Sequence, residues 1–76
     1  MRTLLEILED MFPDVDVANF DEFVDGNIMD SIGMESLADE IEDNFGVSIP
    51  HEEMTPENFN SAKALYALIE RLQDEA

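Results

Sequence analysis

The stretch from Ser31 to Phe45 constrains the fold of this chain most strongly. Its apolar residues recur at three- and four-residue spacing, which places them on one face of a helix; they are Met34, Leu37, Ala38, Ile41 and Phe45. Gly46 follows at the position where a glycine commonly ends a helix. The pattern therefore predicts an amphipathic helix over residues 31–45.

A second amphipathic helix is predicted near the N-terminus, from Thr3 to Met11. Its apolar residues keep the same spacing; they are Leu4, Leu5, Ile7, Leu8 and Met11. Thr3 and Glu6 have the spacing of a capping box, which would satisfy N–H groups at the helix start. Pro13 is expected to end this helix, because proline disfavours helical backbone in the residue before it.

Two more helical segments are predicted in the C-terminal third. Thr55-Pro56 has the pattern of an N-cap followed by proline at the first helical position, and it predicts a single turn that ends near Phe59. Asn60 or Ser61 is then expected to cap a last helix that extends to about Gln73. The buried side of this helix is predicted to include Ala64, Leu65, Leu68, Ile69 and Leu72.

Residues 12–30 form a long polar connection between the first two main helices. A loop of this length in a compact domain needs anchors of its own. The apolar residues in it would supply them by packing on the helices; they are Val15, Val17, Phe20, Phe23, Val24, Ile28 and Met29. The prediction is a single all-α domain over residues 1–76: a small four-helix bundle of three main helices and one short helix, with a long ordered loop.

The charge of the chain excludes several classes of partner. Its formal net charge is −17, from 20 acidic residues against three basic ones. Nucleic acids and anionic membrane surfaces are polyanions, so neither is expected to bind. No apolar run approaches the roughly 20 residues of a membrane span. The chain has no cysteine, which excludes disulfides and thiolate metal sites. We expect a cytoplasmic monomer whose partners present basic surfaces.

The tripeptide Asp30-Ser31-Ile32 stands where the polar connection meets the predicted helix. A serine at a helix start is suited to carry a phosphodiester, because free N–H groups and the positive end of the helix dipole favour negative charge there. Asp30 and Ser31 would otherwise serve only as a helix N-cap. Ile32 lies about 100° around the helix from Ser31, on the polar face, where the core does not explain an apolar residue.

Acidic residues crowd the polar face of the same helix, and no basic residue on it pairs with them. Five acids without a base give up every stabilising ion pair between successive turns, which is costly unless a basic partner docks there. The predicted partner-binding surface consists of Ile32, Met34, Glu35, Asp39, Glu42 and Asp43.

Metal binding and catalysis find little support in the residues. A calcium-binding EF-hand loop that began at Asp21 would place Phe23 at its third position and Ile32 at its twelfth, where oxygen ligands are required. A loop that began at Asp14 fails at its fifth position. His51, the single histidine, is expected to be solvated. No catalytic residue and no metal site is therefore predicted.

Taken together, these segments resemble the acyl carrier protein family. The resemblance spans nearly the whole chain and is strongest from Val24 to Leu68. The residues that carry it are Met29-Asp30-Ser31-Ile32-Gly33, Leu37, Ile41-Glu42, Phe45-Gly46-Val47, Ile49-Pro50 and Phe59-Asn60-Ser61.

The resemblance implies that Ser31 carries 4′-phosphopantetheine. A magnesium-dependent phosphopantetheinyl transferase would add it from coenzyme A, aided by Asp30, and Ile32 completes the motif around the cofactor. The thiol of the arm would hold an acyl or aminoacyl group as a thioester, loaded by a ligase or transferase with a basic docking surface. Because the cofactor supplies the thiol, a chain without cysteine can act as a carrier while not being an enzyme.

Two positions depart from the pattern of many fatty-acid carriers. Those carriers have apolar residues four and eight positions after the serine, where this chain has Glu35 and Asp39. The glycine that follows Ser31-Ile32, Gly33, resembles the pattern of the D-alanyl and peptidyl carriers more. The sequence does not decide which cargo the arm would hold. The rival interpretation is an acidic helical interaction module that binds a basic protein and is never modified.

Overall fold

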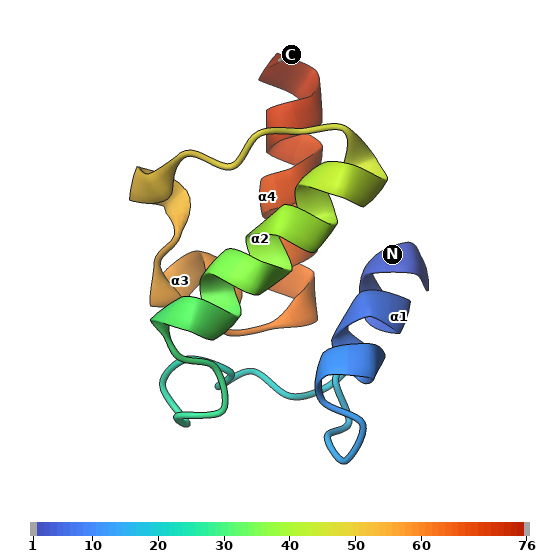
Figure 1. Cartoon of the computed structure of the whole chain (residues 1–76), viewed down its shortest axis with the longest axis vertical. Helices are drawn as coiled ribbons and strands as arrows, with labels where there is room; N and C mark the ends of the chain where they lie inside the picture. The colour runs from blue at the N-terminus through green and yellow to red at the C-terminus, as the bar shows by residue number, and fades with distance from the viewer. Residues whose placement is uncertain (1, 76) are drawn as a thin grey trace.

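The computed structural model describes residues 2–75. Its elements are α1 (Arg2–Met11), α2 (Ser31–Phe45), the 3₁₀ turn η1 (His51–Glu53), α3 (Pro56–Phe59) and α4 (Ala62–Glu75) (Figure 1). These residues contain no strand, so the predicted all-α fold of three main helices and one short helix is confirmed. Helix α2 has the predicted limits, and η1 is an element that the sequence did not predict.

The ends of α1 and α4 differ from the prediction. Thr3 lies inside α1, so it cannot form the predicted capping box, and Glu6 instead pairs with Arg2 across 3.4 Å. Helix α4 extends to Glu75, beyond the predicted end at Gln73. Met1 and Ala76, which the predicted domain 1–76 includes, lie outside the described residues.

The helices cross one another around a shared apolar centre. In Figure 1, α2 runs diagonally in front of α4, and α1 lies to one side. Helix α1 packs on both α2 and α4, and the short α3 packs on α4. Residues 12–30 run from the end of α1 beneath the helices to the start of α2 (Figure 1). Within residues 2–75, no helix is long and apolar enough to cross a membrane.

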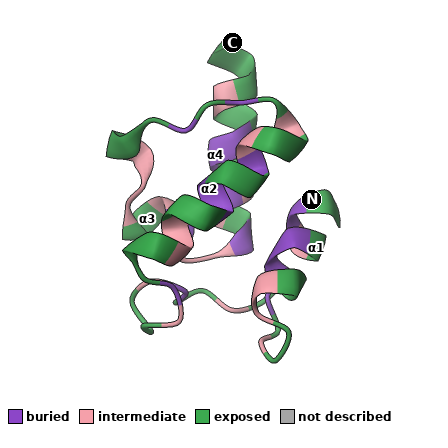
Figure 2. Ribbon diagram, viewed as in Figure 1, coloured by how far each residue is buried: buried purple, intermediate pink, exposed green. Residues whose placement is uncertain are grey.

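The core forms where the apolar faces of α1, α2 and α4 meet. Leu8 of α1, Ile41 of α2 and Leu65 of α4 are each completely buried. The opposite face of α2 is exposed along most of its length (Figure 2). Burial of the predicted apolar stripe therefore decides which side of α2 faces solvent.

Gly46 ends α2 as predicted. Its φ of 68° lies in the left-handed region, and its N–H donates to the Glu42 carbonyl across 3.0 Å. Residues with a side chain rarely adopt this conformation, whereas glycine adopts it at little cost. The chain then leaves the helix in an extended segment in which Val47 and Ile49 are buried.

The connection between α1 and α2 is anchored by Phe23. Its side chain is completely buried, and its ring stacks on Phe12 at 5.5 Å and contacts Phe20 at 5.4 Å between centroids. Val17 and Met29 are buried as well. The other predicted anchors pack partly buried against this core, except Ile28, which is not part of it. The predicted ordered loop is thus confirmed, with Phe23 as its centre.

We expect Phe23→Ala to lower the free energy of unfolding by about 3–5 kcal/mol, because it removes a fully buried ring and leaves a cavity. Phe20→Ala is the matched control, since the Phe20 side chain is only partly buried. It should cost less. Urea denaturation of both variants at one salt concentration measures the difference, and equal losses would contradict the anchoring role of Phe23.

Candidate functional site

Asp30 is the residue that caps α2. Its backbone is extended, with φ −97° and ψ −173°, and its Oδ1 accepts a hydrogen bond of 2.8 Å from the N–H of Gly33. Its carbonyl accepts from the N–H of Met34. Ser31 is therefore the first helical residue, and its hydroxyl is not needed to cap the helix.

Ser31 and Ile32 are both exposed in the first turn of α2. Ile32 exposes 73% of its surface, so the core does not use its side chain, as its helical position predicts. Neither the N–H of Ser31 nor that of Ile32 has a hydrogen-bond acceptor among residues 2–75. An exposed hydroxyl thus stands beside two unpaired N–H groups at the positive end of the helix dipole.

Glycine at position 33 lets this first turn close tightly. A Cβ atom there would lie 3.1 Å from Cγ of Met29 and 3.3 Å from Oδ1 of Asp30. Both neighbours are fixed in place, because Met29 is buried and Asp30 holds the cap. A larger residue would therefore press on the anchor and on the cap of α2 together.

Asn60 links the junction of α3 and α4 to the loop that precedes Ser31. The sequence predicts Asn60 or Ser61 as the cap of the last helix, and the Oγ of Ser61 takes that role by accepting from the N–H of Ala64. The Oδ1 of Asn60 instead accepts from the N–H groups of Val24 and Asp25, at 2.9 and 3.0 Å. Sequence reasoning missed this link, which joins residues far apart in the chain.

An acidic stripe extends from Ile32 along the exposed side of α2. It consists of Glu35, Asp39 and Asp43, which are exposed like Ile32, and the four residues are spaced three or four positions apart. The ion pairs among residues 2–75 are Arg2–Glu6 and Arg71–Glu53, so the acids of this stripe are not neutralised within that part of the chain.

The other two predicted partner-binding residues are placed differently. Met34 is partly buried and packs against the core. Glu42 is also partly buried, and its Oε2 accepts a hydrogen bond of 2.8 Å from the N–H of Ile49. One carboxylate oxygen of Glu42 therefore holds the extended segment that follows α2.

Comparison with known proteins supplies the family. No protein-family profile matches the chain. The chain is 31% identical over 65 residues to the D-alanyl carrier protein of Streptococcus suis (strain 05ZYH33), and the match covers 84% of this chain and 82% of that protein. The chain belongs to the acyl carrier protein family. It is accordingly a carrier and not an enzyme, as the resemblance of its motifs implied.

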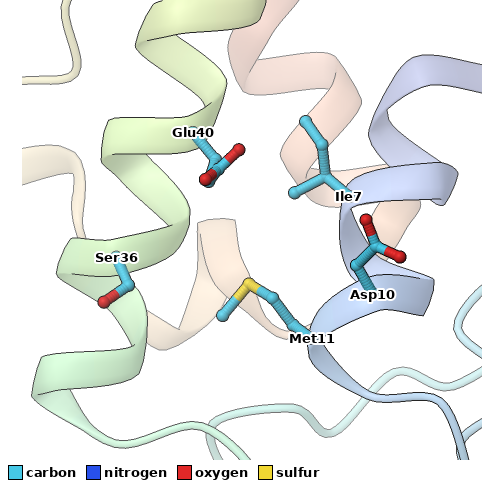
Figure 3. Close-up of a pocket in the computed structure, with 5 residues that line it drawn as sticks. All are labelled: Ile7, Asp10, Met11, Ser36 and Glu40. Atoms are coloured by element: carbon cyan, nitrogen blue, oxygen red, sulfur yellow. The ribbon is translucent and has the colours of Figure 1, made fainter.

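The carrier also has a cleft that sequence reasoning did not find. It has a volume of about 220 Å³ and opens between α1 and α2 (Figure 3). The residues that line it are Ile7, Asp10, Met11, Ser36 and Glu40. Ser36, the second serine of α2, thus belongs to the wall of this cleft. Ser31, in contrast, lies at the start of the helix beside Asp30 and Ile32. The cleft depends on the separation of two helices, for which the sequence carries no signal.

We expect Asp30→Ala to lower the free energy of unfolding of the carrier by about 1 kcal/mol, because it removes the cap of α2. Asp30→Asn is the matched control, since it removes the same negative charge and keeps an oxygen that can accept from Gly33. Ser31→Ala should change the stability less than Asp30→Ala does. Thermal or urea unfolding measures all three variants, and a Ser31→Ala loss equal to that of Asp30→Ala would disprove this assignment of the cap.

Proposed function

We propose that Ser31 of this carrier is the attachment point of 4′-phosphopantetheine, and that the thiol of the arm holds the cargo as a thioester. One observation carries the proposal: the exposed hydroxyl of Ser31 stands in the first turn of α2 beside two unpaired N–H groups. Membership of the carrier family supports it further. The rival interpretation as an unmodified interaction module loses its support with that membership.

The residues around Ser31 fit a phosphodiester. The N–H groups of Ser31 and Ile32 are suited to face its negative charge, and the helix dipole favours an anion there. Asp30 caps the helix through Oδ1 alone, and its Oδ2 has no hydrogen bond within residues 2–75. Asp30 can therefore contact a transferase, or a cation held by it, while the cap stays in place.

Attachment is a phosphoryl-group transfer to the hydroxyl of Ser31. The Oγ–phosphorus bond forms, the bond from that phosphorus to the nucleotide part of coenzyme A breaks, and the serine proton passes to a base of the transferase. The bound cofactor supplies the thiol that the chain, which has no cysteine, lacks. The chain itself contributes the position of the hydroxyl, which is the fixed end of the flexible cofactor arm.

We propose that the cargo is an aminoacyl group, with D-alanine as the first candidate. The name of the Streptococcus relative supports D-alanine. Glu35 and Asp39 support it too, because they put charge where many fatty-acid carriers have apolar docking residues. The partners would be a phosphopantetheinyl transferase and a loading ligase whose docking surfaces present Arg or Lys to the acidic stripe.

Co-expression with a phosphopantetheinyl transferase should add the mass of one arm to the wild-type carrier and none to Ser31→Ala. Ser36→Ala is the matched control, because it removes the other serine hydroxyl of α2, and it should be modified like the wild type. Intact-mass spectrometry reads all three proteins. An arm on Ser31→Ala, or an unmodified wild type, would overturn the assignment.

Reversal of two charges in the acidic stripe should slow loading by a cognate enzyme. The double variant Glu35→Lys/Asp39→Lys is expected to lose about tenfold or more in rate at low ionic strength, where steering is strong, and little at high salt. Glu70→Lys/Asp74→Lys is the matched control, because it reverses two exposed charges at the same spacing on α4.

Ile32→Ala should slow the same reaction at both salt concentrations, since it removes an apolar contact rather than a charge. The exposed side chain of Ile32 contributes nothing to the core, so this variant should fold like the wild type. Stopped-flow or quenched loading assays give the rates. If the stripe reversal and the α4 reversal slowed loading equally, the stripe would not be the docking surface.

A further inference from the structure

Asn60 makes four hydrogen bonds to three consecutive residues of the loop before α2. Its carbonyl accepts from the N–H of Phe23 at 3.0 Å. Its Oδ1 accepts from the N–H groups of Val24 and Asp25, and its Nδ2 donates to Oδ2 of Asp25 at 2.9 Å. A single residue at the end of α3 therefore holds the backbone of residues 23–25.

The same loop segment leads directly to the attachment serine. The carbonyl of Phe23 accepts from the N–H groups of Ile28 and Met29, at 3.0 and 2.7 Å. Met29 is followed by Asp30, which caps α2, and then by Ser31. The hydrogen bonds thus connect Asn60 through the backbone of Phe23 to Met29, and the chain itself continues from Met29 to the first turn of α2.

We propose that Asn60 is a positioning residue for cofactor transfer: by holding residues 23–25 against the α3–α4 junction, it fixes the direction in which the Ser31 hydroxyl is presented. The inference rests on the proposed function of Ser31. It assigns to Asn60 no contact with the cofactor, and its whole effect passes through the loop.

The surroundings of the loop make this effect separable from folding. The Asn60 side chain holds the N–H groups of Val24 and Asp25. Asp25 is exposed and Val24 is only partly buried, so both N–H groups can bond to water when that side chain releases them. Helix α2 keeps its own buried face on the core and its own C-cap at Gly46 without Asn60. Loss of the Asn60 side chain should consequently make the loop before Ser31 more mobile and leave the helices assembled.

The asparagine and aspartate side chains of Asn60 and Asp25 can be exchanged between the two positions. Asn60→Asp keeps an oxygen for Val24 and Asp25 but sets its carboxylate against that of Asp25. Asp25→Asn alone retains an oxygen that accepts from Nδ2 of Asn60. The double variant Asp25→Asn/Asn60→Asp restores one donor and one acceptor in the reverse direction, with the net charge of the wild type.

Asn58→Asp is the matched control for Asn60→Asp. The Nδ2 of Asn58 donates to the carbonyl of Glu53 and lies 3.3 Å from its Oε1, so this substitution also sets two carboxylates against each other. Asn58 belongs to the short helix α3, which Asn60 follows as the C-cap, and both residues are partly buried. Its bonds lead to η1 and not to the loop before Ser31.

The test is the steady-state transfer of 4′-phosphopantetheine from coenzyme A to these variants, at a salt concentration where circular dichroism finds all of them folded. Asn60→Asp should lower kcat about tenfold with little change in KM, because a hydroxyl displaced by about an ångström loses reaction geometry while Ile32 and the acidic stripe still bind the transferase. Asp25→Asn and Asn58→Asp should keep the wild-type kcat, and Asp25→Asn/Asn60→Asp should regain it.

Hydrogen exchange gives a second readout that does not depend on activity: the amides of Val24 and Asp25 should exchange faster in Asn60→Asp and return to wild-type rates in the double variant. A kcat of Asn60→Asp equal to that of Asn58→Asp, or a double variant as slow as Asn60→Asp, would overturn the positioning role. If the wild type itself accepted no arm, the proposed function would fail, and this inference with it.

Discussion

The buried ring of Phe23 anchors the loop that leads to Ser31, the residue that we propose carries the cofactor. Its side chain contacts the rings of Phe12 and Phe20, which ties the middle of the long connection to the core. Its N–H and carbonyl at the same time bond to Asn60 on one side and to Ile28 and Met29 on the other. One residue therefore joins the core, the α3–α4 junction and the segment that leads into α2, where Ser31 is the first residue.

The negative charge of the molecule opposes its compact arrangement. A net charge of −17 is a source of repulsion that a small core has to offset. The acids of the stripe on α2 remain without a basic partner within residues 2–75. We propose that a basic partner surface relieves their energetic cost when it covers them.

Helical periodicity predicted much of this structure, because the apolar stripe of α2 determines which side is buried. The limits of α2, the cap at Gly46 and the exposure of Ile32 all follow from residues within one helix. The error at Thr3 has a different origin. A capping-box spacing is short and occurs by chance, and α1 already includes Arg2, which precedes Thr3.

Features that join distant segments could not be predicted in the same way. Asn60 bonds to residues that precede it by 35 and 36 positions, and nothing in the sequence indicates which loop its side chain reaches. The bond from Ile49 to Glu42 and the cleft beside Ser36 likewise depend on how the elements pack. At the site itself, the sequence identified Asp30 and Ser31 but could not decide which of them caps the helix.

We propose that the hydroxyl of Ser31, presented by an anchored loop, carries the cofactor and its cargo. Fragmentation mass spectrometry of the carrier, after cofactor transfer and loading with D-alanine, tests it most directly. We expect the arm to map to Ser31 and hydroxylamine to release the alanyl group from it, as a thioester requires. An arm that maps to Ser36 or to any other residue would show that Ser31 is not the attachment point.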